Sequence, residues 1–370
     1  YFNNLKRNYV FYAMVITTII MFISIINSPV KSESFRATGN YILGLFLFIV
    51  ALFYIDNNSE NKKKILFSLM SLSIYLFSLS LLKCIDLYQD GQSLKFIISD
   101  QDNILLGWIH PNHSAAIVCI CIFAATYCFI NCIDIKERIF SIFSILISLS
   151  LEVLFLSRAA ILALLLSFIV IIIYYAKRVR NKQNNLKLDS IYFISLTLVF
   201  LVGIIILTSC GILSGVFDEI KELGFKSSSR KELYEIGFKH FKKHWFIGSG
   251  VYSSRYYIET ENPTDIVNNY HNYYIQALSC TGILGGFAFT FYIASIIYII
   301  VKSKDNDYKY LLIVILVYML IHGFFDTIFF NFRIEPLMLI LLSLLYDKKN
   351  PPKNDENMIL NTFSSTINEQ

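Results

Sequence analysis

The chain has 370 residues, of which 55% are hydrophobic and only 16% are charged. A soluble globular domain carries more charge and less apolar content than this. Apolar runs of roughly 17 or more residues recur along the chain, and each is long enough to cross a bilayer as a helix. Because backbone polar groups in hydrocarbon must be satisfied within the protein, these repeated runs predict an all-α, polytopic helical membrane protein.

The apolar runs predict ten membrane spans in this chain. They lie near residues 9–28, 40–55, 65–82, 108–130, 139–157, 159–176, 190–210, 276–301, 309–329 and 334–346. One set of short connections, together with both chain ends, carries 18 Lys and Arg residues, and the alternate set carries 6. The positive-inside rule therefore places the first set in the cytoplasm. The net charge of +5 mostly reflects the basic residues that set this topology, and it does not indicate a nucleic-acid partner.

The spans divide the chain into four expected parts. These are a membrane bundle over 1–210, an outer loop over 211–275, a second bundle over 276–346 and a cytoplasmic tail over 347–370. The outer loop is rich in Lys and Arg, and such a surface suits an anionic ligand. A solvated loop beside anionic lipid head groups explains the same charges.

The outer loop contains a predicted helix that lies along the membrane interface. Ser229 and Glu232 have the spacing of a capping box, with Arg230 at the first helical position. An aromatic stripe follows at helical spacing, which fits a helix with one face toward the membrane. The stripe consists of Tyr234, Phe238, Phe241 and Trp245.

Three polar residues are the main candidates for chemistry, and all three are expected on the outer side. Arg158 stands between two spans, Arg230 opens the loop helix, and His271 precedes the eighth span. Two arginines can hold a diphosphate through paired donors, and a histidine can take a proton from an attacking hydroxyl. Taken singly, each has a structural explanation, since arginines at span ends often reach for head groups. Cysteine, aspartate and histidine show no metal-ligand spacing on this side, so no metal or cofactor is expected.

Weaker candidates stand at the outer ends of other spans. They are Arg36, His110, Asn272, Asp326 and Arg333. His322 and Asp326 are four residues apart, so on one continuous helix they share a face. Helix capping and polar contacts inside the bundle explain these residues equally well.

Three motifs in order resemble a known family. The chain has "SRAA" between two spans, "SSRKELYEIGFKHF" in the outer loop and "HNYYIQALSCTGILGG" at the entry to a span. This set resembles the O-antigen ligase and polymerase superfamily of bacterial inner-membrane glycosyltransferases, and "SFRAT" resembles enterobacterial lipopolysaccharide O-antigen ligases. The resemblance implies a GT-C-like, metal-independent, inverting enzyme of twelve spans with a large periplasmic loop. Two further spans are then expected before Tyr1.

The resemblance also implies roles for the candidates. Arg158 and Arg230 would bind the diphosphate of an undecaprenyl-linked O-antigen donor, and His271 would activate a hydroxyl of the lipid A-core acceptor. Relatives often have proline before the glycine turn, where this chain has His244-Trp245. O-antigen polymerisation by the same chemistry is the first alternative. A flippase for the lipid-linked sugar is the second, although the outer-side cations and the lack of internal repeats disfavour it.

Overall fold

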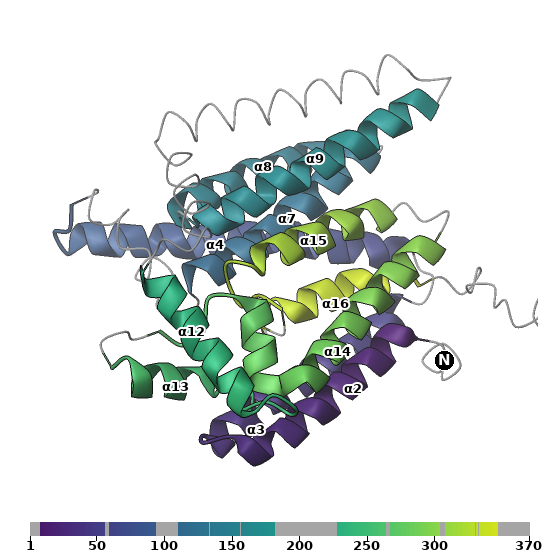
Figure 1. Cartoon of the computed structure of the whole chain (residues 1–370). Helices are drawn as coiled ribbons and strands as arrows, with labels where there is room; N and C mark the ends of the chain where they lie inside the picture. The colour runs from purple at the N-terminus through teal and green to yellow at the C-terminus, as the bar shows by residue number, and fades with distance from the viewer. Residues whose placement is uncertain are drawn as a thin grey trace, which may run out of the picture.

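The computed structural model describes residues 8–55, 59–93, 110–132, 134–155, 157–181, 228–263, 267–303, 308–329, 331 and 333–346. Regular structure in these ranges is helical throughout (Figure 1). The elements are α2 (Tyr9–Ser24), the 3-10 turn η1 (Ile25–Asn27), α3 (Lys31–Ile55), α4 (Ser59–Gln89), α7 (Pro111–Asn131), α8 (Ile135–Phe155), α9 (Arg158–Asn181), α12 (Ser228–Lys243), α13 (Ser254–Glu261), α14 (Tyr273–Lys302), α15 (Tyr308–His322) and α16 (Glu335–Ser343).

The helices confirm the expected all-α, polytopic membrane class. Five of them are long and apolar enough to cross a membrane: Tyr9–Asn27, Lys31–Ile55, Glu60–Gln89, Pro111–Asn131 and Tyr273–Lys302. Shorter apolar stretches lie in α9 and α15. Each predicted span except 190–210 coincides with a helix, and 190–210 lies outside the described residues. The ninth span was predicted to reach residue 329, but α15 ends at His322, so Asp326 lies in the turn that follows rather than on the helix.

The helices form two groups with α15 between them. Figure 1 shows α4, α7, α8 and α9 on one side and α2, α3, α14 and α16 on the other. The α7 helix packs against α4, α8, α9 and α15, and most of it is buried. Its many alanines and cysteines let neighbouring backbones approach closely, which stabilises helix packing within a membrane.

One end of the bundle brings together helix termini that are far apart in the sequence. Asn112 at the start of α7 donates to the Asp326 carboxylate beyond α15 (2.7 Å) and accepts from Ser157, just before α9 (2.8 Å). We call this end, where α7 and α9 begin and α15 ends, the site end.

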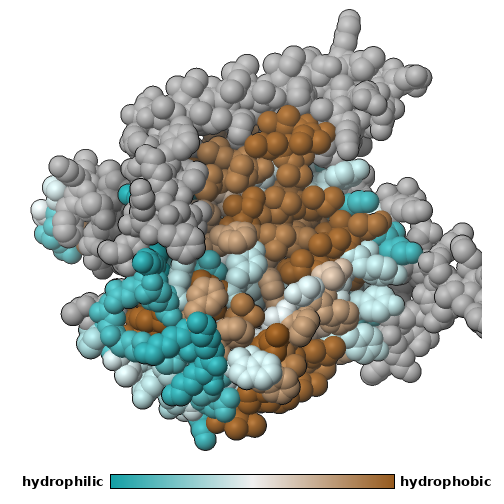
Figure 2. All heavy atoms as spheres, viewed as in Figure 1, coloured by the Kyte–Doolittle hydropathy of each residue, from teal (hydrophilic) through white to brown (hydrophobic). Residues whose placement is uncertain are grey.

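Helices α12 and α13 lie in the hydrophilic surface in Figure 2, whereas the long helices are covered by hydrophobic side chains.

The α14 helix is broken at Gly282, which has non-helical torsions (φ 65°, ψ −166°). Residues 245–250, which we call the clasp, satisfy the backbone groups that the break exposes. The carbonyls of Trp245 and Phe246 accept from the amides that follow Gly282 (2.8 and 3.3 Å). The amides of Ser249 and Gly250 donate to the carbonyls that precede it (3.0 and 2.9 Å). Because backbone groups at membrane depth need partners inside the protein, the clasp makes the break possible.

The clasp requires glycine where its chain passes α14. Gly248 has a positive φ of 77°, and a Cβ there would lie 2.3 Å from the backbone of Cys280. The turn that the sequence "FIGSG" makes is therefore packed against a broken helix.

The loop helix differs from its prediction at both ends. It begins at Ser228, so Ser229 lies inside the helix instead of before it, and the predicted cap position is wrong. It ends at Lys243, so Trp245 lies in the clasp beyond the helix. The second loop helix, α13, was not predicted. It is tied to α12 by Glu261, which pairs with His240 at 2.6 Å and with Lys239 at 2.8 Å.

Candidate functional site

His271 stands on a turn immediately before α14. Its backbone has a positive φ of 47°, and its amide donates to Asn269 Oδ1 (2.7 Å). The next residue, Asn272, caps α14, because its Oδ1 accepts from the amides of Tyr274 and Ile275 (3.0 and 3.1 Å). Asn272 was a weaker candidate for the site, and this capping gives it a structural role. His271 thus occupies a left-handed turn directly before a capped helix start.

Asp326 meets His271 because the start of α14 is bonded to the turn after α15. The amide of Tyr273 donates to Gly323 O (2.8 Å), and Asn272 Nδ2 donates to Phe324 O (3.1 Å). His271 Nδ1 then lies 3.8 Å from Asp326 Oδ1. This separation is longer than a hydrogen bond and within the range of an ion pair. Asp326 is buried, whereas the His271 side chain keeps 22% of its surface exposed.

The carboxylate of Asp326 has several donors around it. It accepts from the Thr327 amide (2.6 Å) and from Asn112 Nδ2 (2.7 Å), and His113 Nε2 lies 3.7 Å away. Burial acts to raise the pKa of Asp326, but His113 and His271 act against it, and the resulting pKa lies well below the usual value. Asp326 therefore remains a buried anion, which favours any positive charge that develops on His271.

The start of α7 adds two more imidazoles. The His110 ring lies 6.2 Å from the His271 ring and 5.7 Å from the His113 ring, measured between centroids. His113 also contacts Asn331 (3.3 Å between Nδ1 and Nδ2), and Asn331 accepts from the amide of Arg333 (3.0 Å). Of the weaker candidates, His110 thus lies beside His271, whereas the backbone amide of Arg333 bonds to Asn331, which contacts His113.

The residue before Arg158 is connected through polar contacts to Asp326, the partner of His271. Ser157, the preceding residue, donates to Asn112 Oδ1, and Asn112 donates to the Asp326 carboxylate. The Ser157 hydroxyl also accepts from the amide of Ala160 (3.3 Å) at the start of α9. The first residue of α9, Arg158, is therefore fixed at the site end close to the residues that surround Asp326.

Arg230 lies on a helix that packs against the segment just before His271. Leu233 and Ile236 of α12 form a buried cluster with Tyr270 and other residues of this end. Gly237 allows the close approach, because a Cβ there would lie 2.5 Å from a methyl carbon of Ile275. Arg230 precedes Gly237 by seven residues, which is two helical turns, so the two share a face of α12. The half-buried Arg230 is thus on the side of α12 that faces α14.

Arg36 is the candidate that the structure separates from this group. It lies near the start of α3 and is exposed. Two residues earlier, Ser34 bonds to Ser28 (2.7 Å) and donates to Val251 O (2.5 Å), next to the clasp. Its inclusion beside His271 has no support from these contacts.

Sequence reasoning missed Asn112, His113, Ser157 and Asn331. The sequence "HPNH" did draw attention to the start of α7, but no sequence signal indicated that this start meets the turn after α15. Among the described residues, no group of three His, Cys, Asp or Glu side chains has an arrangement that could hold a metal ion.

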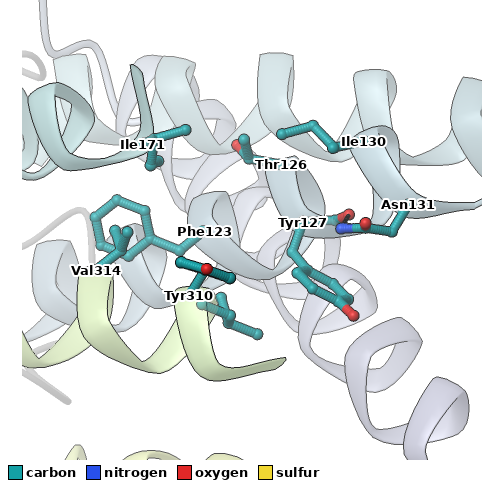
Figure 3. Close-up of a pocket in the computed structure, with 9 residues that line it drawn as sticks. Phe123, Thr126, Tyr127, Ile130, Asn131, Ile171, Tyr310 and Val314 are labelled. Carbon is teal, nitrogen blue, oxygen red and sulfur yellow. Dashed lines mark hydrogen bonds between the residues drawn. The ribbon is translucent and has the colours of Figure 1, made fainter. Parts of the chain in front are cut away.

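A small hollow lies near the other end of α7 and is distinct from the His271 group (Figure 3). It is lined mainly by apolar and aromatic side chains of α7, α9 and α15, including Phe123, Tyr127 and Val314. Its cavity volume of about 30 Å³ is enough for water.

The fold and this site define a polytopic membrane protein with a histidine–carboxylate pair and arginines at one end of its bundle. Residues 140–290 match the family model described as O-antigen ligase. Over this interval the chain is similar to the O-antigen ligase superfamily, which includes ligases and polymerases. The matched interval contains Arg158, Arg230 and His271. No curated protein matches the chain.

Proposed function

We propose that the protein is an O-antigen ligase that transfers O-antigen polysaccharide from undecaprenyl diphosphate to a sugar of lipid A-core. Its site would face the periplasm from the inner membrane of a Gram-negative bacterium, as the positive-inside count suggests. The observation that carries the proposal is the approach of His271 Nδ1 to the buried Asp326 carboxylate (3.8 Å) at the end where α9 begins with Arg158.

His271 would act as the general base. With Nδ1 turned to Asp326, Nε2 is the ring nitrogen available to an acceptor hydroxyl. A carboxylate in this position favours the tautomer with its proton on Nδ1 and stabilises the imidazolium that forms, as in other histidine–carboxylate pairs. The partial exposure of the ring allows a sugar to reach it.

The reaction would be a single displacement at the anomeric carbon of the donor. The acceptor oxygen forms the new glycosidic bond as the bond between that carbon and the diphosphate oxygen breaks. The hydroxyl proton goes to His271 Nε2, and the bonding electrons leave with undecaprenyl diphosphate. Attack from the face opposite the leaving group inverts the anomeric configuration.

Arg158 and Arg230 would bind the diphosphate and stabilise the charge that grows as it leaves. Guanidinium groups remain charged at all relevant pH values and bind phosphate through two parallel donors. The two residues come from different elements that both reach the site end, so they can hold a diphosphate from two sides. Groups that meet the developing charge of a transition state lower the barrier more than groups that bind substrate alone.

The test is an in vitro transfer assay with purified protein, lipid-linked O-antigen and lipid A-core. His271→Ala, Arg158→Ala and Arg230→Ala should each nearly abolish transfer. His244→Ala and Arg255→Ala are matched controls on the loop, since Arg255 is exposed and pairs with Glu259 (2.7 Å), and they should keep activity.

The same assay separates the alternatives. Wild-type rates in the His271 variant would remove the proposed base. Longer chains on undecaprenyl diphosphate with nothing on lipid A-core would identify a polymerase, and movement of donor across a membrane without a new glycosidic bond would identify a flippase.

A further inference from the structure

The break in α14 marks the depth of the clasp in the membrane. Residues 283–302 follow the break, and at 1.5 Å per residue they span roughly 30 Å, the thickness of the hydrocarbon core. With Lys302, the last residue of α14, taken as the opposite boundary, Gly282 falls at the hydrocarbon boundary on the site side. Since the carbonyls of Trp245 and Phe246 bond to the first amides after Gly282, these two aromatic residues are fixed at the same boundary.

The aromatic side chains at this boundary face outward. Trp245 is 56% exposed and Phe246 is 51% exposed. Phe287, four residues beyond Ile283 on the membrane-crossing part of α14, is 68% exposed and so faces lipid. Aromatic rings with one apolar face are typical of membrane–water boundaries, and lipid is therefore the natural neighbour of Trp245 and Phe246.

Exposed cations lie just beyond these rings. Lys242 and Lys243, at the end of α12, are exposed, and neither forms an ion pair within the described residues. Earlier lysines on the same helix differ, since Lys239 pairs with Glu261 (2.8 Å) and Lys231 with Glu235 (3.7 Å). The charges of Lys242 and Lys243 are thus available at head-group depth.

The turn between α2 and α3 brings a third cation and a further ring to this level. Asn27 Nδ2 donates to Gly248 O (3.0 Å), and Ser34 Oγ donates to Val251 O (2.5 Å). The residues after Ser34 are Phe35, which is 62% exposed, and Arg36, which is exposed. Two segments far apart in the sequence therefore present the same combination of ring and cation beside the clasp.

We propose that Lys242, Lys243 and Arg36, together with Trp245, Phe246 and Phe35, form a surface that binds the phosphate groups of anionic phospholipids in the leaflet on the site side. The rings enter the acyl boundary and the cations meet the head groups above it. The end of α12 is thereby held on the bilayer, while Arg230 at its other end lies over the site. The proposal does not depend on the reaction that His271 performs.

Trp245 provides a direct reporter of this lipid. The chain has two tryptophans, and Trp108→Phe leaves Trp245 as the only one. The protein is placed in nanodiscs that contain both phosphatidylglycerol and phosphatidylcholine, with shallow bromine labels on the acyl chains of only one of them. Quenching of Trp245 then shows which lipid is its neighbour.

Bromine on phosphatidylglycerol should quench Trp245 more than bromine on phosphatidylcholine at the same mole fraction. The implied enrichment should be at least about fivefold, the factor for one Lys or Arg near an anionic bilayer surface. Lys242→Gln with Lys243→Gln and Arg36→Gln should abolish the preference and leave quenching by both lipids equal. Lys231→Gln with Lys239→Gln, a matched change on the same helix, should preserve it.

Three results would overturn the proposal: equal quenching by the two lipids in the reporter protein, no quenching by either, or the same loss of preference in the matched control. If Trp108→Phe fails to fold, subtracting the signal of Trp245→Phe from that of the unaltered protein gives the same measurement.

Discussion

Replacing Asp326 with asparagine tests the site most directly, because it removes a charge and preserves shape. One carboxylate oxygen accepts from the Thr327 amide and the other from Asn112 Nδ2. An asparagine offers one acceptor and one NH₂ group, so one of these donors would face another donor. His271 would also lose the anion that lies 3.8 Å from its Nδ1.

The expected effects follow from these contacts. A buried donor left without its acceptor costs about 1–3 kcal/mol, so Asp326→Asn should lower the free energy of unfolding by that order. General base catalysis contributes roughly 10²- to 10⁴-fold, and a base without its orienting carboxylate should lose much of this. We expect kcat to fall within that range and KM to change little, since Asp326 is buried and would not touch substrate.

The stability effect should depend on pH with a definite sign. The folded pKa of Asp326 lies below its usual value, so its ionised form stabilises the protein above the unfolded pKa of about 3.9. This contribution is lost as the pH falls from there toward the folded pKa. The stability gap between wild type and Asp326→Asn should therefore be constant from pH 7 to about pH 5 and shrink below about pH 4.

Transfer kinetics and thermal unfolding of the same purified samples measure both effects. Glu261→Gln is the matched control, because Glu261 forms a second carboxylate–histidine pair, with His240, between α12 and α13. It should reduce stability slightly and leave kcat within a few-fold of wild type. A folded Asp326→Asn protein with wild-type kcat would refute the role assigned to the carboxylate.

Three further outcomes are expected. Arg158→Lys and Arg230→Lys keep the charge but lose the paired donors, so kcat/KM should fall by about tenfold or more, the value of one charged hydrogen bond; full activity would contradict bidentate binding. EDTA should leave the transfer rate unchanged, and a loss that Mg²⁺ restores would show that the arginines do not suffice. Gly248→Ala should destabilise the protein by about 2 kcal/mol or more in thermal unfolding, because its Cβ would lie 2.3 Å from the Cys280 backbone. Gly39→Ala in α3 is the control, and it should not destabilise the protein, because a Cβ at Gly39 would have no atom within 4 Å.

The sequence predicts the helices well because hydropathy is a local property. Each described span followed from its apolar run alone. The predicted end of α15 was wrong because phenylalanine and isoleucine residues continue the apolar run beyond the last helical residue. Gly323 lies directly after His322, the last helical residue, and its amide still bonds to Met319 O (2.9 Å) while the chain turns. Hydropathy does not distinguish an apolar helix from an apolar turn.

The site was predicted only in part, because its contacts are tertiary. His271, Arg158 and Arg230 could be named from residue type and position at span ends. Asp326 was expected to share a helix face with His322, yet it acts from a turn and meets His271 across 55 positions of sequence. The partnership of Asn112 with Asp326 joins helices that no local pattern relates.

The position of the site follows from two opposing requirements. An anion such as Asp326 is stabilised in a buried place only when donors surround it, and helix ends supply free donors and flexible turns that a helix interior lacks. The proposed base, His271, would need access to an aqueous sugar, which excludes the middle of the bilayer. The helix ends at the site end satisfy both requirements. The break at Gly282 then lets α14 contribute to this end, because its first turns need not continue the direction of the membrane-crossing part. The clasp that satisfies the break follows directly after α12, so its bonds to α14 also hold the end of α12 against this helix.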